Sequence, residues 1–430
     1  MKQDWERTKR LLSLAKGPAR RAPDPSIPSP EPLSGRSGKG QAEAGAESSL
    51  QVREQETPYG RCLIRELEFP RSYTHGNTPL EWLLSAGEEG RALLGKDPRL
   101  KEISLPSLLF LDLETTGLGG SGAYAFLVGL GFFRAERFTI RQYFMRDFSE
   151  ERALLFALRD FLSGSQGVVS YNGKMFDLPF LSDRFIMNRM RSPLEGLPHL
   201  DLLFPARRLW RERMGSCSLV HLEEGLLGMR RAGDVPSELI PSLYFRYLQH
   251  KNPVIIEPVF SHNVRDLLSL MALKARACLM VEDPQGFAVG HSLDYYCLGK
   301  LFEDLGHWER GIVCYECALQ QDLPRDLREE ARRRLSLILK RAGDRPRAVQ
   351  IWQGSIRRGG VEFDFFSCEE LAKHKEHQEK DYEGAILIVE QALERLAMLD
   401  FPSSEVHALR ASFEHRLRRL EHKLRGERWY

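Results

Sequence analysis

The sequence contains 430 residues, of which 42% are hydrophobic and 28% are charged, with a formal net charge of +2 at pH 7. This length predicts two or three domains, because a domain usually takes about 150 residues. The longest apolar run, near residues 125–133, is interrupted by glycines and is too short to cross a bilayer, so the composition excludes a membrane-spanning protein.

Cysteine usage and the start of the chain indicate a cellular compartment. The seven cysteines are scattered and odd in number, which favours a reducing environment over a disulfide framework. The first residues have no apolar core of the kind that secretory signals contain. We therefore expect a cytoplasmic protein without a membrane partner. Because the net charge is close to zero, any affinity for nucleic acid must come from local patches.

Residues 1–50 read as a tail. Six prolines occur between residues 16 and 40, together with Gly, Ser and Arg, a composition that cannot bury a core. Residues 1–40 carry nine Lys and Arg against four Asp and Glu. We expect a disordered basic tail, which is either an electrostatic tether to nucleic acid or a solvated linker. Residues 51–104 then form a lead-in segment, helical over 80–94, that packs on the following domain.

An α/β pattern begins near residue 105. Runs of β-forming residues between turn signals predict strands, and helical periodicity predicts the helices between them. The expected strands cover residues 108–113, 125–133, 138–145 and 168–171, and the expected helices cover 150–162, 179–191 and, with Ser261 as N-cap, 267–280. Strands followed by helices predict an α/β domain over residues 105–283, with a mixed sheet flanked by helices.

The last third of the chain has an internal repeat. Gly306, Gly311 and Tyr315 recur 37 residues later as Gly343, Ala348 and Trp352, and again as Lys380, Ala385 and Val389. A small residue followed by an aromatic or apolar residue is typical of stacked helix pairs. We expect an all-α helical-repeat domain over residues 288–430 that resembles tetratricopeptide repeats, ends in a capping helix and offers a groove to a protein partner. An unrelated helical bundle is the alternative.

The strongest chemical signal is the run Phe-Leu-Asp-Leu-Glu-Thr-Thr-Gly at residues 110–117. Asp112 and Glu114 are two apart on a predicted strand, so their side chains lie on one face. Unpaired carboxylates in so apolar a frame are costly, and a cation would relieve that cost. Hard oxygen ligands select Mg²⁺ or Mn²⁺, and two such ions about 4 Å apart hydrolyse phosphodiesters.

Two further segments supply carboxylates. Asp177 follows a strand end and an Asn-Gly turn at the entrance to a helix, where it is either a helix cap or a metal ligand. His262 and Asp266 are four apart on a helix and therefore point the same way. Asp266 can hold a metal while His262 draws a proton from the attacking water, since the pKa of an imidazole lies near neutrality.

Other polar residues near these motifs are candidate substrate contacts. Arginines surround Trp210 and either hold a single strand by charge and stacking or form a solvated helix face, and Asp201 is a further candidate polar contact. The predicted substrate-binding residues, all close to a carboxylate motif, are Thr115, Gly117, Asn172, Lys174 and Asn263. The glycine-rich segment 119–122 has little side-chain bulk, so a substrate strand can approach its backbone.

The three carboxylate segments resemble the exonuclease motifs of the DEDD superfamily, which has a ribonuclease H-like fold. More closely, residues from about 55 to 280 resemble the bacterial YprB-type ribonuclease H-like proteins, some of which carry a helical-repeat tail. The likeness rests on residues 110–117, 119–126, 171–180, 219–228, 234–241 and 262–270.

This resemblance implies 3′-to-5′ removal of nucleotides with two Mg²⁺ or Mn²⁺ ions. Asp112, Glu114, Asp177 and Asp266 would take the metal-ligand roles, and His262 would be the general base. One departure concerns spacing: three residues separate His262 from Asp266, whereas the histidine class of the superfamily usually has four and its tyrosine class three. This hybrid spacing puts the catalytic rate and the preferred metal in doubt.

Three functions are consistent with these residues. The first is a metal-dependent exonuclease acting on single-stranded DNA or RNA ends. The second is a nucleic-acid-binding scaffold whose nuclease site is weak or degenerate and whose repeats bind protein partners. The third is an endonuclease of the same fold. The sequence does not distinguish DNA from RNA, because no residue can be assigned to a 2′-hydroxyl.

Overall fold

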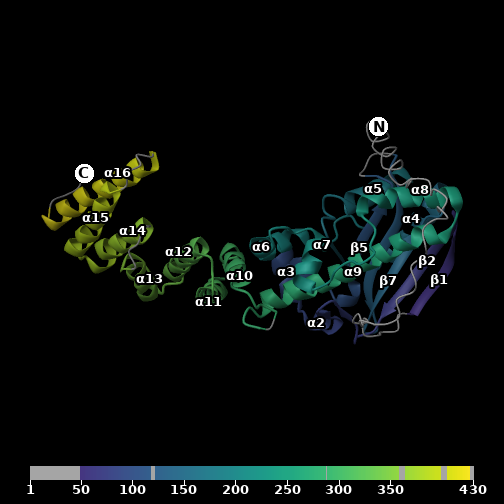
Figure 1. The fold of residues 1–430 in the computed structure, drawn as a ribbon, viewed down its shortest axis with the longest axis horizontal. Helices are drawn as coiled ribbons and strands as arrows, with labels where there is room; N and C mark the ends of the chain where they lie inside the picture. Colours follow the sequence, from purple (N-terminus) through teal and green to yellow (C-terminus); the bar gives the residue numbers. More distant parts are fainter. Residues whose placement is uncertain (1–48, 118–121, 287, 358–363, 399–403, 427–430) are drawn as a thin grey trace, which may run out of the picture. The chain divides into compact units, whose positions relative to one another are not determined.

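The computed structural model describes residues 49–117, 122–286, 288–357, 364–398 and 404–426. The chain divides into two compact units, Met1–Asp283 and Pro284–Tyr430, and each is described by itself below (Figure 1). The predicted tail, except for its last two residues, and the glycine segment 119–121 lie outside the described residues.

The first unit is built on a mixed seven-stranded sheet, as predicted. Its strand order is β1-β2-β7-β6-β5-β8-β9; neighbouring strands are antiparallel from β1 to β5, and β8 and β9 are parallel to β5. The strands are β1 (Ser49–Thr57), β2 (Gly60–Phe69), β5 (Leu108–Thr115), β6 (Ala125–Arg134), β7 (Arg137–Phe144), β8 (Gly167–Ser170) and β9 (His199–Asp201), with β3 (Thr74–His75) and β4 (Thr78–Pro79) forming a separate pair.

Helices flank this sheet (Figure 1). They are α2 (Leu80–Ser85), α3 (Glu88–Gly95), α4 (Glu151–Leu162), α5 (Asp177–Met187), α6 (Leu203–Met214), α7 (Leu219–Leu222), α8 (Ile240–His250) and α9 (Pro253–Glu282). Short turns of helix are η1 (Pro98–Lys101), η2 (Leu105–Ser107), η3 (Phe148–Glu150), η4 (Glu223–Leu227, π-helical) and η5 (Ser237–Leu239).

Helices cover both faces of the sheet, which places the core in two layers. Successive side chains of a strand point to opposite faces. On β7, the Tyr143 ring lies 6.5 Å from Phe161 of α4, whereas the Phe144 ring lies 4.9 Å from Phe260 of α9. The central strand β6 is therefore buried along nearly its whole length, in keeping with its almost continuous apolar sequence.

Several features of this unit differ from the sequence prediction. The helix predicted over 80–94 is two helices, α2 and α3, and the helix predicted over 179–191 is α5, which covers Asp177–Met187. The lead-in segment supplies β1 and β2, which extend the sheet beyond β7, in addition to helices. The last helix of the unit starts earlier than expected: Ser261 is inside α9, whose N-cap is Asn252, with its side chain accepting a hydrogen bond from the Val254 amide at 3.0 Å. Burial of Ile256 and Val259 extends α9 toward its N-terminus despite Pro258.

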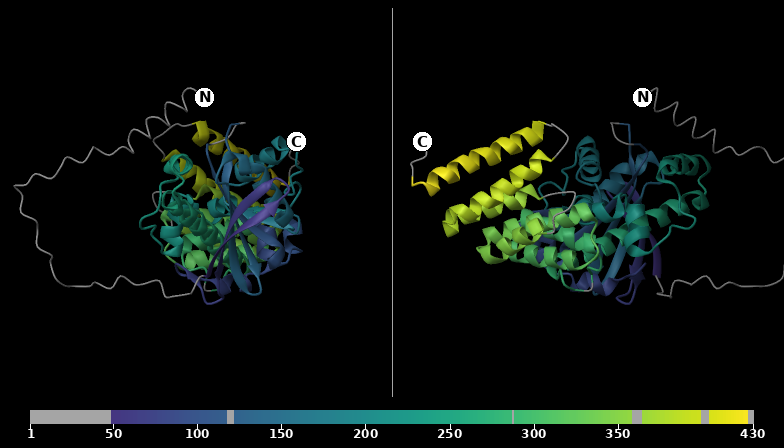
Figure 2. Two further views of the ribbon diagram at one scale, coloured as in Figure 1. Left: turned by 90° about the vertical axis from the view of Figure 1, so that its right-hand side faces the viewer. Right: turned by 60° about the vertical axis from the view of Figure 1, so that its left-hand side comes forward.

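The second unit is all helical. Its helices are α10 (Ser292–Asp304), α11 (Trp308–Gln320), α12 (Arg325–Arg341), α13 (Arg345–Arg357), α14 (Phe365–His374) with the π-helical turn η6 (Lys375–Glu379), α15 (Tyr382–Ala397) and α16 (Ser404–Leu424). Figure 2 shows α15 and α16 side by side in yellow, and the apolar stripe of α16 buries Phe413 and Leu420 there, although Leu424 is 48% exposed.

The 37-residue repeat has a structural counterpart. Gly306, Gly343 and Lys380 all have left-handed backbone conformations, with φ of 74°, 90° and 59°. Each follows the first helix of a pair, where a left-handed residue ends a helix. The small and apolar positions that follow them are buried on the second helices: Gly311 and Tyr315 on α11, Ala348 and Trp352 on α13, and Ala385 and Val389 on α15. The all-helical prediction is therefore confirmed, and the repeated positions take equivalent places in three helix pairs, while the assignment to tetratricopeptide repeats stays a prediction.

A search of the described segments for a helix both long and apolar enough to span a membrane finds none. All seven cysteines are free thiols.

Candidate active site

Strand β5 carries the first two carboxylates. Asp112 and Glu114 are both on this central strand, two residues apart, so they share a face. A register irregularity follows directly, between Glu114 and Thr115, which ends the regular pairing with β6. Asp112 is partly exposed and Glu114 is 8% exposed, so this face is half buried at the end of the strand.

The third carboxylate belongs to a tight turn between β8 and α5. Asp177 is the first residue of α5 and is 7% exposed. The preceding turn is held by Asp201 at the end of β9, whose carboxylate accepts hydrogen bonds from the amides of Asn172 at 2.7 Å and Lys174 at 3.0 Å. Asn172 has φ of 64°, and a Cβ on Gly173 would lie 3.1 Å from Asp177 Oδ2. The turn is thus packed directly against this carboxylate.

Helix α9 supplies the fourth carboxylate and the histidine. His262 Nε2 lies 3.6 Å from Asp266 Oδ2, one helical turn further on, so the two side chains point the same way as predicted. The other ring nitrogen, Nδ1, lies 3.0 Å from Asp234 Oδ2. Asp234 comes from the loop before α8 and is itself contacted by Arg265, whose guanidinium lies 3.1 Å from Oδ1. The imidazole of His262 is therefore held between two carboxylates.

Asp266 and Asp177 act electrostatically on both carboxylates of β5, so residues of β5, α5 and α9 lie near one another. Burial first, and then the charges of Asp266, Glu114 and Asp177, raise the pKa of Asp112 well above its usual value. Burial and the charges of Asp266 and Asp177 do the same to the pKa of Glu114.

Burial raises the pKa of Asp177 and of Asp266 as well, and the charge of Asp266 adds to the rise at Asp177. Burial raises the pKa of Asp177 to about 7, against hydrogen bonds from the backbone of Asp177 and Leu113, and the charges of Asp201 and Asp266 add to the rise. Since Leu113 is the residue between the two carboxylates of β5, Asp177 lies against that strand. Burial also raises the pKa of Asp266, although Arg231 and His262 oppose the rise.

Arg231 is the cation of this region. Its guanidinium bridges three carboxylates: Glu223 Oε1 at 2.6 Å, Asp234 Oδ2 at 3.0 Å, and Asp266. Its side chain is 7% exposed, so the ion pairs are screened little by water. Although burial acts against them, His262 and Arg231 hold the pKa of Asp234 below its usual value. Glu223 also accepts a hydrogen bond from Ser269, which is 2.9 Å from His75 Nε2.

The chemistry of these four carboxylates suits a hard divalent ion, but their positions do not surround a common point. Within the parts of the chain that the structure describes, no three carboxylate, imidazole or thiol groups have an arrangement that could hold a metal ion. Arg231 contacts Asp266, and the Asn263 amide donates to Asp112 Oδ2 at 2.7 Å. Asp266 and Asp177 nevertheless raise the pKa of both carboxylates of β5, and carboxylate oxygens are the ligands that Mg²⁺ and Mn²⁺ generally prefer.

Asn263 differs from the prediction. It was expected to contact substrate, but its side chain is fully buried. Its amide nitrogen donates to Asp112, and its Oδ1 accepts a hydrogen bond from Gln142 Nε2 at 2.8 Å. A Cβ on Gly129 would lie 2.2 Å from Asn263 Oδ1, so glycine at that position of β6 makes the room. Asn263 therefore positions a carboxylate instead of facing a ligand.

The other predicted substrate residues are at the surface of the site. Thr115 donates its hydroxyl to the Gly117 carbonyl at 2.8 Å, and both residues are half buried. Asn172 and Lys174 are exposed beside Asp177. Trp210 is 2% exposed, so its arginine neighbours have no open indole face with which to stack a base.

Sequence reasoning missed the residues that hold this site together: Asp234, Arg231 and Glu223, and the clamping role of Asp201. Asp234 and Glu223 belong to segments 219–228 and 234–241, which carried part of the family likeness, and that was the available signal. Their roles depend on contacts with α9, up to 46 residues away in sequence, which local patterns do not reveal.

Comparisons with known proteins agree with this fold. A model of the RNase H superfamily matches residues 109–278. The protein YprB of Bacillus subtilis (strain 168), which is described as uncharacterised, is 32% identical over 351 residues, covering 80% of this chain and 83% of YprB. Among solved structures, the family B DNA polymerase of the archaeon Pyrobaculum calidifontis aligns at 16% identity with a TM-score of 0.32. That alignment covers 48% of this chain and 28% of the polymerase, and so weak a likeness carries no argument.

Proposed function

Because this chain belongs to the family of the Bacillus subtilis protein YprB and contains an RNase H superfamily domain, we propose that it is a metal-dependent nuclease. Its proposed reaction is hydrolysis of phosphodiester bonds at single-stranded nucleic-acid ends in the 3′-to-5′ direction. The observation that carries the proposal is the meeting of Asp112, Glu114, Asp177 and Asp266, from β5, α5 and α9, in one electrostatically coupled cluster beside His262.

Asp112, Glu114, Asp177 and Asp266 are the residues that would hold two Mg²⁺ or Mn²⁺ ions. When bound, such ions polarise the phosphodiester and make a bound water more acidic. The carboxylates need this partner for a physical reason: burial and mutual repulsion disfavour their ionised forms. Asn263 fixes the rotamer of Asp112 from the buried side of the sheet.

His262 would accept the proton of the attacking water. Its Nδ1 is engaged by Asp234 at 3.0 Å. With Nδ1 donating to that carboxylate, Nε2 is the nitrogen with a free lone pair, and it is the one on the Asp266 side of the ring. Asp234 is then a positioning residue, because it sets the tautomer and the orientation of His262 without facing the substrate.

The turn before α5 would receive the substrate. Lys174 is exposed beside Asp177, and its Nζ lies 6.0 Å from the ring centre of Phe204, which is 38% exposed. A cation next to an accessible aromatic ring suits a single strand, through a phosphate contact and base stacking. We propose that Lys174, Asn172, Thr115 and Gly117 contact the strand end.

The second unit has a separate proposed role. We infer that residues 288–430 are tetratricopeptide-like repeats capped by α16 that bind protein partners, and that the nuclease domain occupies residues 105–283 with residues 51–104 as its lead-in. The left-handed residues that end the first helix of each pair at 37-residue intervals support the repeat assignment.

One observation favours a second candidate, a nucleic-acid-binding scaffold with a weak nuclease site. Arg231 neutralises Asp266, one of the four carboxylates, and a guanidinium in that position competes with a metal ion for the same oxygen. The spacing of His262 and Asp266 also departs from the usual histidine class.

A degradation assay tests the two candidates. Labelled single-stranded DNA and RNA oligomers, each with one blocked end, are incubated with Mg²⁺ or Mn²⁺ and with the full chain or its Asp112→Asn variant. The nuclease proposal predicts mononucleotide release from free 3′ ends that Asp112→Asn abolishes without unfolding the protein. Binding without release favours the scaffold, and cleavage of circular strands favours an endonuclease. Undiminished release by Asp112→Asn would reject the site assignment.

A further inference from the structure

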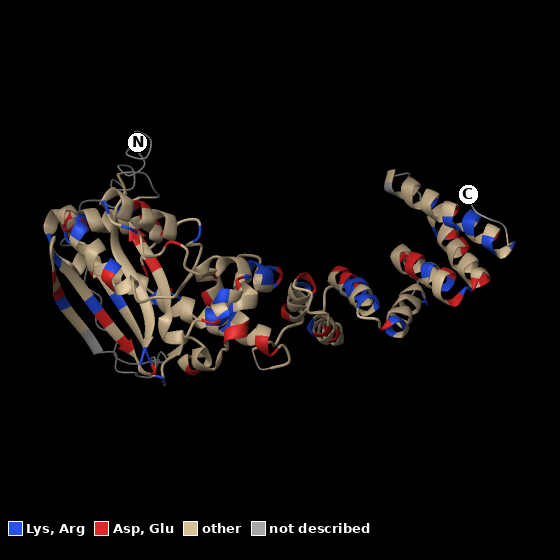
Figure 3. Ribbon diagram, turned by 180° about the vertical axis from the view of Figure 1, so that it is seen from behind, with Lys and Arg blue, Asp and Glu red and all other residues tan. Residues whose placement is uncertain are grey.

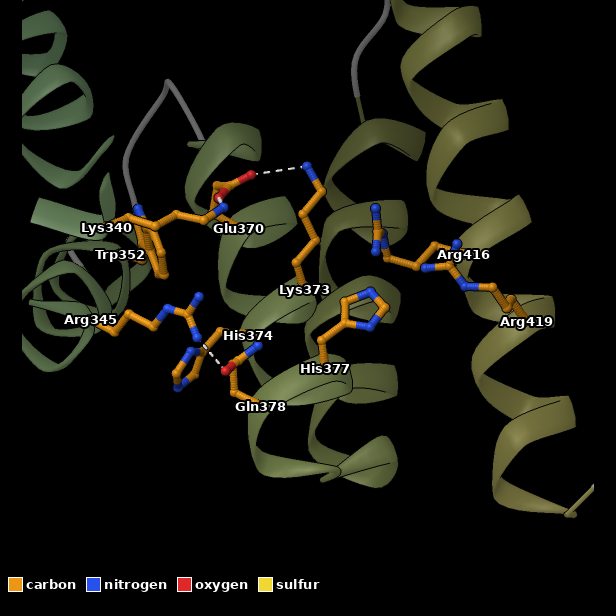
Figure 4. Close-up of a pocket in the computed structure, with 10 residues that line it drawn as sticks. All are labelled: Lys340, Arg345, Trp352, Glu370, Lys373, His374, His377, Gln378, Arg416 and Arg419. Atoms are coloured by element: carbon orange, nitrogen blue, oxygen red, sulfur yellow. Dashed lines mark hydrogen bonds and ion pairs between the residues drawn. The ribbon is translucent and has the colours of Figure 1, made fainter. Parts of the chain in front are cut away.

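A separate pocket lies among the helices of the second unit, and none of its lining residues belongs to the candidate active site. It has a volume of about 270 Å³ and is lined by side chains of α12, α13, α14, η6 and α16 (Figure 4). Five of the ten lining residues are Lys or Arg and only one is acidic: the cations are Lys340, Arg345, Lys373, Arg416 and Arg419, and the acid is Glu370.

This charge is local to the pocket. Residues 284–430 contain 24 Lys and Arg against 25 Asp and Glu, and Figure 3 shows both signs interspersed along the helices. A concave site with an excess of one sign focuses its field on a small ligand of the opposite sign. The near-neutral composition of the whole unit is unlike the broad basic surface that a nucleic-acid track requires.

Ion pairs with two glutamates, Glu370 and Glu376, hold four of the five cations in place. Glu376, in η6, is fully buried, and its carboxylate accepts hydrogen bonds from Arg419 at 2.7 Å and from Arg416 at 3.2 Å. Glu370 lies 2.6 Å from Lys340 and 2.9 Å from Lys373. These ion pairs fix the positions of the cations before a ligand arrives, which lowers the entropy lost on binding.

Arg345 is the cation best suited to meet a ligand. It is exposed at the first residue of α13, and the group that its guanidinium contacts is the neutral amide oxygen of Gln378 (Figure 4). An anion that replaced this contact would add the attraction between opposite charges, which the neutral amide of Gln378 does not supply.

The indole of Trp352 bears on the class of anion that the pocket accepts. Trp352 lines the pocket but is only 2% exposed, so it offers no face on which a nucleobase could stack, and stacking is a principal source of single-strand affinity. Arginine and lysine side chains around a bounded cavity, with an exposed guanidinium fork at Arg345, match carboxylate groups instead. Grooves of helical repeats accept extended peptides.

We propose that this pocket binds a segment of a partner protein that carries clustered carboxylates. The proposal names the ligand class of the second unit and does not depend on the nuclease activity of the first.

Fluorescence anisotropy with the full chain tests the pocket. The probe is a labelled short poly-glutamate peptide, and the competitors are a poly-glutamine peptide of equal length and oligothymidylate. Arg345→Glu should weaken binding of poly-glutamate about tenfold or more, since it removes one charge-assisted contact and adds a repulsive charge. Arg357→Glu is the matched control, because Arg357 is an exposed arginine on the same helix that does not line the pocket. Lys340→Gln, on a different helix, is a second variant with the same expected direction.

Three outcomes overturn the proposal: no binding of poly-glutamate, equal affinity for the Arg345→Glu and Arg357→Glu variants, or competition by poly-glutamine as effective as by unlabelled poly-glutamate. If oligothymidylate displaces the peptide and its own affinity falls in Arg345→Glu, the pocket is a nucleic-acid site and the proposal is equally wrong. Thermal melting of each variant confirms that the compared proteins are folded.

Discussion

Asp234 Oδ2 lies 3.0 Å from Nδ1 of His262, although the two residues are 28 positions apart, one in a loop and one inside α9. Both side chains are less than 10% exposed. This contact fixes the orientation of the His262 imidazole. It also links the candidate general base to Arg231, which binds the same carboxylate at 3.0 Å.

Replacing Asp234 by Asn tests this orientation. The variant keeps the shape of the side chain but removes the charge that Nδ1 of His262 contacts. We expect kcat for strand hydrolysis to fall about 10-fold to 100-fold, the usual cost of losing an orienting partner, with KM little changed because Asp234 does not face the substrate. Steady-state kinetics measure both constants. Asp160→Asn, an exposed aspartate on α4, is the control; an equal kcat for the two variants would show that Asp234 does not position His262.

The ion pairs of Arg231 should contribute to the thermal stability of the protein. Arg231→Gln leaves Glu223, Asp234 and Asp266 without their shared cation, and breaking a buried ion pair costs about 3–5 kcal/mol. We expect a lower melting temperature in EDTA than for the unchanged protein. Because Asp266 is also released, Mn²⁺ should stabilise the variant more than it stabilises the unchanged protein. Differential scanning fluorimetry with and without Mn²⁺ checks both, and equal melting temperatures in EDTA would contradict the assigned role.

Gly173 tests the packing of the turn against Asp177. A Cβ at this position would lie 2.2 Å from Ser170 Oγ and 3.1 Å from Asp177 Oδ2. Gly173→Ala should therefore displace the turn, destabilise the protein by about 1–3 kcal/mol and reduce Mn²⁺ affinity. Gly122→Ala is the matched control, since a Cβ there has no atom within 4 Å. Denaturant unfolding measures the stability of both variants, and Mn²⁺ titration measures their metal affinity. Unchanged Mn²⁺ affinity in Gly173→Ala would show that this turn does not position a metal ligand.

The raised pKa of Asp177 should make the free energy of unfolding depend on pH when EDTA removes divalent ions. Its pKa is raised from 3.8 to about 7 in the folded protein, mainly by burial. Between these two values the folded chain keeps a proton that the unfolded chain has released, so the free energy of unfolding should fall as pH rises from about 4 to about 7. The loss should be on the order of a few kcal/mol.

Asp177→Asn removes this titration. At pH 4 the variant should resemble the unchanged protein, and at pH 8 it should be the more stable of the two. Urea unfolding across this range measures the difference, and parallel pH profiles for the two proteins would contradict a raised pKa at Asp177.

The fold was predictable wherever a local pattern coincided with burial. The apolar run around Asp112 predicted β5, and a helix was predicted over residues 179–191, where α5 covers Asp177–Met187. Strand β1 escaped prediction because most of its side chains are exposed and polar, so it lacks the apolar alternation of a half-buried strand. The predicted helix is shorter than α9 because the sequence pattern indicates Ser261 as its N-cap, whereas packing of Val259 and Phe260 continues the helix toward its N-terminus.

The sequence pointed to the carboxylates of the candidate site, but it did not reveal the residues that position them. Asp112, Glu114, Asp177 and Asp266 each belong to a short motif with its own chemistry. Asn263 was predicted to contact substrate, and only its distance of 2.7 Å to Asp112 reveals a buried positioning role. Arg231 is one of many arginines in the chain, and nothing local distinguishes it until the loop before α8 folds back onto α9.

Manganese titration by calorimetry is the most direct test of the central claim, that three separated segments form one site for divalent ions. The claim predicts that the full chain binds about two Mn²⁺ ions, that Asp112→Asn and Asp266→Asn each lose most of this binding, and that Asp160→Asn retains it. Failure of the full chain to bind Mn²⁺, or binding that all three variants retain equally, would contradict it.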